Sequence, residues 1–136
     1  PVLCRCRMDR VNINRGVIWD LKKIVSADGK TCSRHVQSYG YHLQHASNTR
    51  ALAVLRPELV GRIDMLYAFM EVEPPYAVRV TRPSAVMAEM GRVEWERAVL
   101  LWERCLRTGK WPGYGGGIVP LEPTTWHATE VLGNDW

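Results

Sequence analysis

Hydrophobic and polar residues alternate through the first part of the chain, from residue 3 to residue 13. Asn14, Arg15 and Gly16 then form a turn signal, and a second β-rich run follows in residues 17–24. A period of two places successive side chains on opposite faces of a strand. This pattern predicts a β-hairpin made of residues 3–13 and 17–24.

Helical spacing follows the hairpin. Residues 32–55 predict one helix, whose apolar stripe is weakened by Gly40. A second helix is predicted for residues 84–107, which lie between Pro83 and Gly109. Its expected apolar face consists of Met87, Met90, Ala98, Leu101, Trp102 and Cys105. The methionines and the tryptophan of this stripe indicate core packing rather than a ligand site.

Between these helices, residues 63–72 alternate as a strand would, and residues 76–81 return as its partner after a Pro-Pro turn. Residues 110–136 are rich in Gly and Pro and predict an irregular tail that wraps the domain. The order of the elements predicts an α/β sandwich with a mixed central sheet. We expect residues 1–136 to form one domain. Its central strand should present Met65, Tyr67 and Phe69 on one face.

Three charged residues fall at matching positions of the predicted hairpin. Asp20 and Lys22 lie two residues apart, so their side chains share one face of the strand, and Trp19 is expected to pack against helices on the other face. A two-residue turn at positions 14–15 would place Asp9 opposite Asp20. A turn one residue later would place it opposite Lys22. Either register gathers the three charges, whereas a three-residue loop would split them unless a bulge intervened.

Two carboxylates and one ammonium around one point are groups suited to cutting a phosphodiester bond. Mg²⁺ takes oxygen ligands, commonly one or two carboxylates together with phosphate and water. A neighbouring lysine can orient or polarise the attacking water. The same spacing is also compatible with solvent-facing charges on an edge hairpin, because an Asp-x-Lys sequence is short and common.

Several segments, taken in order along the chain, carry a resemblance to a known family. Asp9, in Met8-Asp9-Arg10, stands where that family has a "PD" aspartate, with Met8 in place of Pro. Residues 17–23, VIWDLKK, are similar to its "vvDlKT" strand, with Lys23 in place of Thr or Ser. Further matches are residues 71–78 (EVEPPYAV) to "ekePyaV" and residues 110–114 (KWPGY) to "geWpgY". These segments resemble the PD-(D/E)XK nuclease superfamily, in particular RecB/RecE-like enzymes of the phage exodeoxyribonuclease VIII type.

A helix segment of that family is also matched. Residues 40–46, GYHLQHA, are similar to its "gYhlQaa.Y" pattern, in which Tyr41 and Gln44 match together. The family's last tyrosine would fall on Asn48, so half of the Q-xxx-Y pair is absent. A second pair with this spacing, Gln37 to Tyr41, leaves another alignment open.

The resemblance spans roughly residues 3–126 and implies a restriction-endonuclease-like core with a divalent metal. By this resemblance Asp9 and Asp20 would hold Mg²⁺ or Mn²⁺, with the Leu21 carbonyl as a backbone ligand. Lys22 would position the attacking water or stabilise the transition state. The family also carries an upstream helical segment with an acidic residue, often with a histidine, that completes the metal site. We expect this chain, which starts at Pro1 without Met, to be a fragment that lacks it.

The resemblance further implies an exonuclease that processes DNA ends for phage-type recombination and supplies single strands to an annealing protein. The expected DNA-binding residues are Tyr41, Gln44, Lys23 and Arg34, although Tyr41 and Gln44 would alternatively brace the active site. The sequence does not distinguish exonuclease from endonuclease action. A homo-oligomer is compatible with both. Two alternatives stay open: a non-catalytic DNA-binding remnant of the nuclease fold, and a structural interaction domain that binds no nucleic acid.

The charge distribution is compatible with a polyanionic partner. The chain has 18 Lys and Arg against 14 Asp and Glu, a net charge of +4. All of the excess lies in residues 1–56, where only Asp9, Asp20 and Asp28 are acidic. The basic residues of this part are Arg5, Arg7, Arg10, Arg15, Lys22, Lys23, Lys30, Arg34, Arg50 and Arg56. Such a surface would suit a phosphate backbone, although solvated helix and hairpin faces have the same composition.

The cysteines and histidines suggest no metal cluster. Cys105 stands alone, which argues against the iron–sulfur cluster of some superfamily members. Cys4 and Cys6 are expected to be buried thiols on the strand face opposite Asp9, as in a reduced cytoplasmic protein. His42 and His45 share a helix side, where a polar surface or a DNA contact is expected rather than zinc.

The sequence contains no run of about 18 apolar residues, so no membrane-spanning helix is predicted. The charged start of the chain does not resemble a signal peptide.

Overall fold

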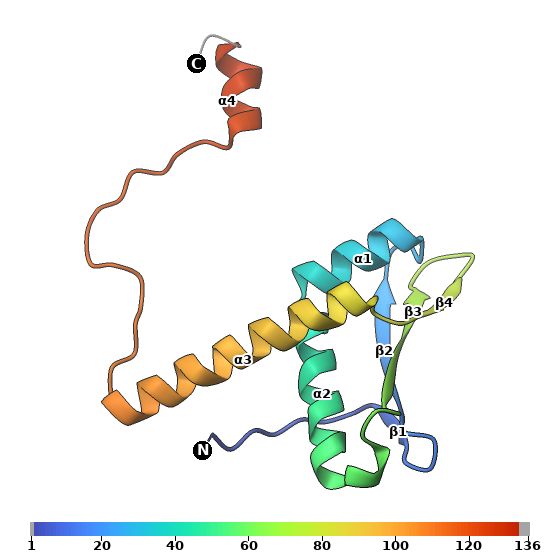
Figure 1. Cartoon of the computed structure of the whole chain (residues 1–136). Helices are drawn as coiled ribbons and strands as arrows, with labels where there is room; N and C mark the ends of the chain where they lie inside the picture. Colours follow the sequence, from blue (N-terminus) through green and yellow to red (C-terminus); the bar gives the residue numbers. More distant parts are fainter. Residues whose placement is uncertain (1, 134–136) are drawn as a thin grey trace.

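A mixed four-stranded sheet lies at the centre of the structure, a computed structural model that describes residues 2–133. Its order is β1 (Arg10–Asn12), β2 (Val17–Ile24), β3 (Asp64–Glu71) and β4 (Val78–Thr81), as Figure 1 shows. The outer strands pair antiparallel with their neighbours, whereas β2 and β3 pair in parallel. This mixed sheet with flanking helices confirms the predicted α/β architecture.

The first hairpin adopts one of the two registers expected from the sequence. Arg10 lies opposite Trp19, and the same register continued by one residue places Asp9 opposite Asp20. Pairing begins only at Arg10, so the predicted strand over residues 3–13 is too long. The preceding segment is extended but unpaired, which leaves Cys4 exposed and Cys6 half-buried. The prediction that these two thiols are buried on a strand is therefore wrong.

Two helices and a short 3₁₀ turn connect the parallel strands: α1 (Gly29–Ser38), α2 (Tyr41–Leu55) and η1 (Pro57–Leu59). The single helix predicted for residues 32–55 is wrong, because the chain breaks at Gly40. Its φ of +66° is a left-handed conformation that glycine adopts without strain. Because of this break, α1 and α2 run in different directions.

The core lies between one face of the sheet and the helices α1 and α2. The strands contribute Ile18 and Ile24 from β2 and Met65, Tyr67 and Phe69 from β3, which confirms the predicted face of that strand. Cys32, Val36, Leu52 and Leu59 complete the cluster from the helical side. Burying these side chains in one contiguous cluster supplies the main stabilisation of the domain.

The opposite face of the sheet, here called the outer face, carries no helix among residues 2–133 (Figure 1). Strand alternation places Trp19, Leu21 and Lys23 of β2 on it, next to Ala68 of β3. Leu21 and Lys23 are exposed, and Trp19 is half-buried. The prediction that Trp19 is buried against helices is therefore wrong.

A third helix, α3 (Ala85–Thr108), packs against α2 where a glycine permits a close approach. A Cβ atom on Gly91 would lie 2.1 Å from the carbonyl oxygen of His42, a distance that no side chain tolerates. The buried His42 ring also joins the helices: Nδ1 lies 3.1 Å from the Val36 carbonyl oxygen, and Nε2 lies 2.9 Å from Glu94 Oε2. His42 is a packing residue, so the expected surface or DNA-contact role is wrong for it.

The distal half of α3 projects away from the sheet (Figure 1). Its Trp102 side chain is 52% exposed and meets the ring of Trp111 edge-on, with 4.9 Å between the ring centroids. Met90, Ala98 and Leu101 are exposed as well, so the predicted core stripe is wrong at these four positions of α3 and holds at the buried Cys105.

Residues 110–132, here called the arm, follow α3. The predicted irregular tail is confirmed as far as residue 124, but α4 (Thr125–Leu132) is helical, and positions 134–136 lie outside the described residues. The arm does not wrap the domain as expected, since Tyr114 and Leu121 are fully exposed and α4 stands apart from the sheet (Figure 1). None of the described helices is long and apolar enough to cross a membrane.

The contact of α2 with α3 gives a first test. Gly91→Ala should lower the free energy of unfolding by about 1–3 kcal/mol, because the added methyl group forces the two backbones apart. This loss should appear although Ala favours a helix over Gly by about 1 kcal/mol. The matched control is Gly29→Ala, where a Cβ meets nothing within 4 Å and stability should be kept or raised. Urea denaturation measures both, and equal stability of the two variants would contradict the close approach.

Candidate active site

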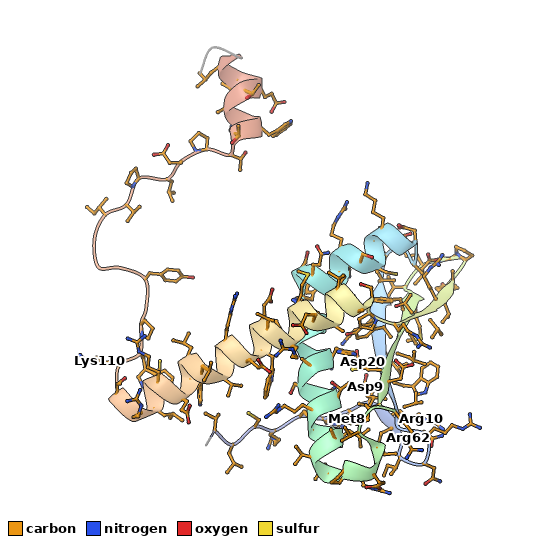
Figure 2. All side chains as sticks on the ribbon, viewed as in Figure 1. Met8, Asp9, Arg10, Asp20, Arg62 and Lys110 are labelled. Carbon is orange, nitrogen blue, oxygen red and sulfur yellow. The ribbon has the colours of Figure 1, made fainter. Side chains whose placement is uncertain are left out.

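Asp9 and Asp20 come together on the side of the sheet that carries α2, as Figure 2 shows. Asp20 lies in the middle of β2 and is only 1% exposed, whereas Asp9 precedes β1 and is exposed. The Leu21 backbone N–H donates to Asp9 Oδ2 at 2.9 Å. In the hairpin register Leu21 lies opposite Met8, which precedes β1, so the Asp9 carboxylate satisfies a strand N–H that β1 does not pair. This bond fixes Asp9 beside β2.

Asp20, Lys22 and Gln44 form a closed ring of polar contacts, here called the Asp20 ring. Asp20 Oδ2 lies 2.5 Å from Lys22 Nζ, and apart from this ion pair it has no hydrogen-bond partner. Lys22 Nζ donates to Gln44 Oε1 at 2.9 Å, and Gln44 Nε2 donates to Asp20 Oδ1 at 2.7 Å. Since lysine only donates and a carboxylate only accepts, these partners determine the orientation of the Gln44 amide.

Two tyrosines support the ring. Lys22 Nζ lies 4.0 Å from the centre of the Tyr41 ring, a distance at which a cation is attracted by an aromatic face. The Tyr67 hydroxyl donates to the Tyr41 carbonyl oxygen at 2.8 Å and so holds the start of α2 on β3. Burial, together with the charge of Asp20, raises the pKa of Tyr67, so its hydroxyl stays protonated.

Tyr67 was not among the site residues predicted from sequence. The alternation of residues 63–72 places it on the core face of its strand, but only the parallel register brings it opposite Asp20. That register depends on the length and packing of the crossover, which periodicity does not reveal.

The structure separates the predicted DNA-binding residues. Tyr41 and Gln44 belong to the Asp20 ring and its support, whereas Lys23 lies on the outer face and Arg34 is exposed on α1. Gln37, the glutamine of the alternative Q-xxx-Y pair, is also exposed on α1. Tyr41 and Gln44 are therefore the members of the matched helix segment that reach the candidate site.

Asn48 stands where the family pattern has its second tyrosine. Its side chain is buried, and Nδ2 lies 4.0 Å from Met65 Sδ in the core. Asn48 lies one helical turn after Gln44, so it also faces the sheet. Its short side chain does not take part in the Asp20 ring.

The oxygen atoms beside the Asp20 ring suit a hard cation. Asp20 Oδ2 is buried with no partner other than Lys22, and the bond to Leu21 uses only one oxygen of Asp9. Together with the Leu21 carbonyl these groups match Mg²⁺, which commonly uses one or two carboxylates and completes its shell with water and phosphate. Within residues 2–133 no cluster of three or more His, Cys, Asp or Glu side chains could hold a metal ion. A cation at this position would thus depend on water and substrate for most of its ligands.

The sequence matches the family model described as "PDDEXK-like domain of unknown function (DUF3799)" over residues 1–121. The chain belongs to this family. Its membership confirms the predicted PD-(D/E)XK superfamily and a nuclease-type fold, while the RecE-like assignment stays a prediction. Proteins of this superfamily generally use divalent metal ions. No curated protein matches the sequence.

The Asp20 ring predicts different effects for two glutamines. Gln44→Ala removes hydrogen bonds to a buried carboxylate and to its lysine, so it should lower the free energy of unfolding by about 1–3 kcal/mol. Gln37→Ala, at an exposed position of the preceding helix, should change it by less than about 0.5 kcal/mol. Urea denaturation of both variants measures the difference. A larger effect at Gln37 would mean that the other glutamine–tyrosine pair is the structural one.

Proposed function

We propose that this domain is a metal-dependent deoxyribonuclease with Asp9, Asp20 and Lys22 as its reactive groups. The observation that carries the proposal is the Asp20 ring, in which a buried carboxylate and an ammonium are held together beside a second carboxylate. Such a combination is costly to bury, and groups held at a cost are typical of functional sites. Membership in a PDDEXK-like family supports the same function.

Each residue has a role in this proposal. Asp9, Asp20 and the Leu21 carbonyl would hold the cation, which is Mg²⁺ or Mn²⁺. The chemistry that such a cation supplies is activation of water and neutralisation of charge on the phosphate. Lys22 would donate to the attacking water or to a phosphate oxygen, where charge develops in the transition state. Gln44 orients Lys22 through the bond between Nζ and Oε1.

The finer part of the proposal concerns substrate and setting. By the resemblance to RecE-like enzymes, the domain would act as an exonuclease on DNA ends in the cytoplasm. Its single-stranded product would pass to an annealing protein during phage-type recombination. The concentration of basic residues in the first part of the chain supports a phosphate backbone as partner.

A second candidate function is a non-catalytic DNA-binding remnant of the nuclease fold. The observation that favours it is the closed state of the Asp20 ring. The ammonium of Lys22 has three N–H groups, and its neighbours are Asp20, Gln44 and the face of Tyr41. A ring satisfied in this way is stable without metal or substrate. The remnant would bind DNA equally well in EDTA and in Mg²⁺, whereas the nuclease would not.

Asp20→Asn tests the metal site. We expect Mn²⁺ affinity to fall by at least about tenfold and DNA cleavage to be lost, because a neutral amide is a poor ligand for a hard cation. Unfolding should become easier by about 1–3 kcal/mol, since Lys22 keeps Gln44 as acceptor but loses its counter-charge. Mn²⁺ binding is measured by electron paramagnetic resonance on metal-stripped protein. Asp64→Asn, which alters the carboxylate paired with Arg82 on the surface, is the matched control and should bind Mn²⁺ normally.

Full Mn²⁺ affinity in Asp20→Asn would show that Asp20 is not a ligand. An unaltered protein that binds no Mn²⁺, yet binds DNA equally in EDTA and Mg²⁺, would establish the remnant instead.

Two adjacent lysines separate catalysis from binding. Lys22→Met should lower turnover by about a hundredfold or more and change DNA affinity little, because Lys22 acts on the transition state. Lys23→Met is the matched control: its side chain lies on the outer face, so turnover should be kept. Single-turnover cleavage and filter binding at several salt concentrations distinguish the two. Unchanged turnover in Lys22→Met, with weaker and less salt-sensitive binding, would reduce Lys22 to a backbone contact.

A further inference from the structure

The outer face is an apolar surface that lacks a covering layer. Parallel strands such as β2 and β3 are normally covered on both faces. Here Leu21, Val78 and Val80 are each more than half exposed. A hollow of about 880 Å³ lies where this face meets the edge strand β1, and it is lined by Trp19, Leu21 and Ala68 of the face and by residues 10–14 of the edge. A large exposed apolar surface of this kind marks an interaction site.

Beyond Trp111, whose ring meets Trp102 of α3, the arm is an apolar segment that lacks a surface to pack on. Its exposed large side chains are Trp111, Tyr114, Ile118, Val119, Leu121, Trp126, Val131 and Leu132. Helix α4 has eight residues and none of them is buried. An isolated helix of that length is not stable in water, so α4 requires a surface to pack against.

The direction of α3 makes it unfavourable for α4 to pack on the outer face of its own chain. The helix starts close to β4 and its 24 residues extend about 36 Å, so Lys110 lies at the far end of α3 from the sheet (Figure 2). The linker from Gly109 to Thr124 has about 16 residues and an average span of about 22 Å. Reaching its own outer face would require the linker to return along α3 and then pass around the sheet. The outer face of a second copy can be approached directly.

The charges of the arm and of the outer face also favour a contact between them. The acidic residues of the arm are Glu122 and Glu130, whereas the outer face carries Arg10 and Lys23 at two of its strands. Opposite charges around an apolar contact fix its orientation and exclude other partners.

We propose that this protein forms a two-fold dimer in which the arm of each copy seats α4 on the outer face of the other. The inference is independent of the proposed nuclease activity, because the contact involves neither Asp20 nor Lys22. It gives the sheet its missing layer and α4 its missing surface in one symmetric arrangement.

Complementation between two variants tests this exchange. The arm variant carries Trp126→Glu and Leu132→Glu. The face variant carries Val78→Glu and Val80→Glu, at exposed positions of β4 on the outer face. Either variant alone disrupts both contacts of the dimer and should sediment as a monomer where the unaltered chain is dimeric. In an equal mixture, the arm of the face variant meets the intact face of the arm variant. One contact is restored, so heterodimers should reappear.

The matched control is Val86→Glu, at an exposed valine of α3 outside both surfaces, which should stay dimeric. Circular dichroism checks that the face variant is folded, and the arm variant alters no residue of the core. The proposal is overturned if the unaltered chain is monomeric at all concentrations reached, if either variant alone stays dimeric, or if the mixture stays monomeric. The last result would mean that each arm packs on its own chain.

Discussion

The burial of one carboxylate, that of Asp20, beside an ammonium constrains the arrangement of the domain. Moving a charge of this kind out of water costs several kcal/mol even after relaxation, so the surroundings must return most of that energy through polar contacts. Lys22 returns part of it from the same strand, because a spacing of two puts both side chains on one face. Gln44 supplies the rest from α2, and it can do so only if that helix lies at a fixed position over β2. The polar site thus determines where a helix packs.

The position of α2 is in turn set by backbone geometry at two glycines. Gly40 breaks the helical path, which allows α2 to present Tyr41 and Gln44 to the sheet independently of the direction of α1. Gly91 allows α3 to touch the backbone of α2 on the other side, at His42. Adjacent residues of α2 therefore serve different neighbours: Tyr41 supports Lys22, and His42 holds α1 and α3. A shift of α2 that relieved one of these contacts would break the other.

Sequence reasoning succeeded where the signal is local and failed where it depends on the packing of distant elements. Strand alternation placed Asp20 and Lys22 on one face, and the turn residues permitted the register that sets Asp9 opposite Asp20. Gly40 predicts only a weak point of one long helix, because a single glycine lowers helix propensity without necessarily ending the helix. The exposure of Trp102 was missed because an amphipathic pattern shows which face is apolar but not whether a neighbour covers it. The place of Tyr67 beside Asp20 could be found only from the parallel register of β2 and β3. The metal and DNA roles of the site residues stay predictions.

The closed state of the Asp20 ring limits how the proposed chemistry can begin. The three N–H groups of Lys22 are matched by three neighbours, Asp20, Gln44 and the face of Tyr41, so a phosphate that accepts from the ammonium takes the place of one of them. Gln44 is the neutral member, and exchanging its carbonyl for an anionic oxygen strengthens the hydrogen bond that Lys22 makes. The same movement releases Asp20 Oδ1 from the Gln44 amide and frees it for a cation. In the proposed reaction, entry of the phosphate and exposure of the carboxylate would therefore be coupled through Gln44, and the ring would open at little net cost only when phosphate and cation are both present.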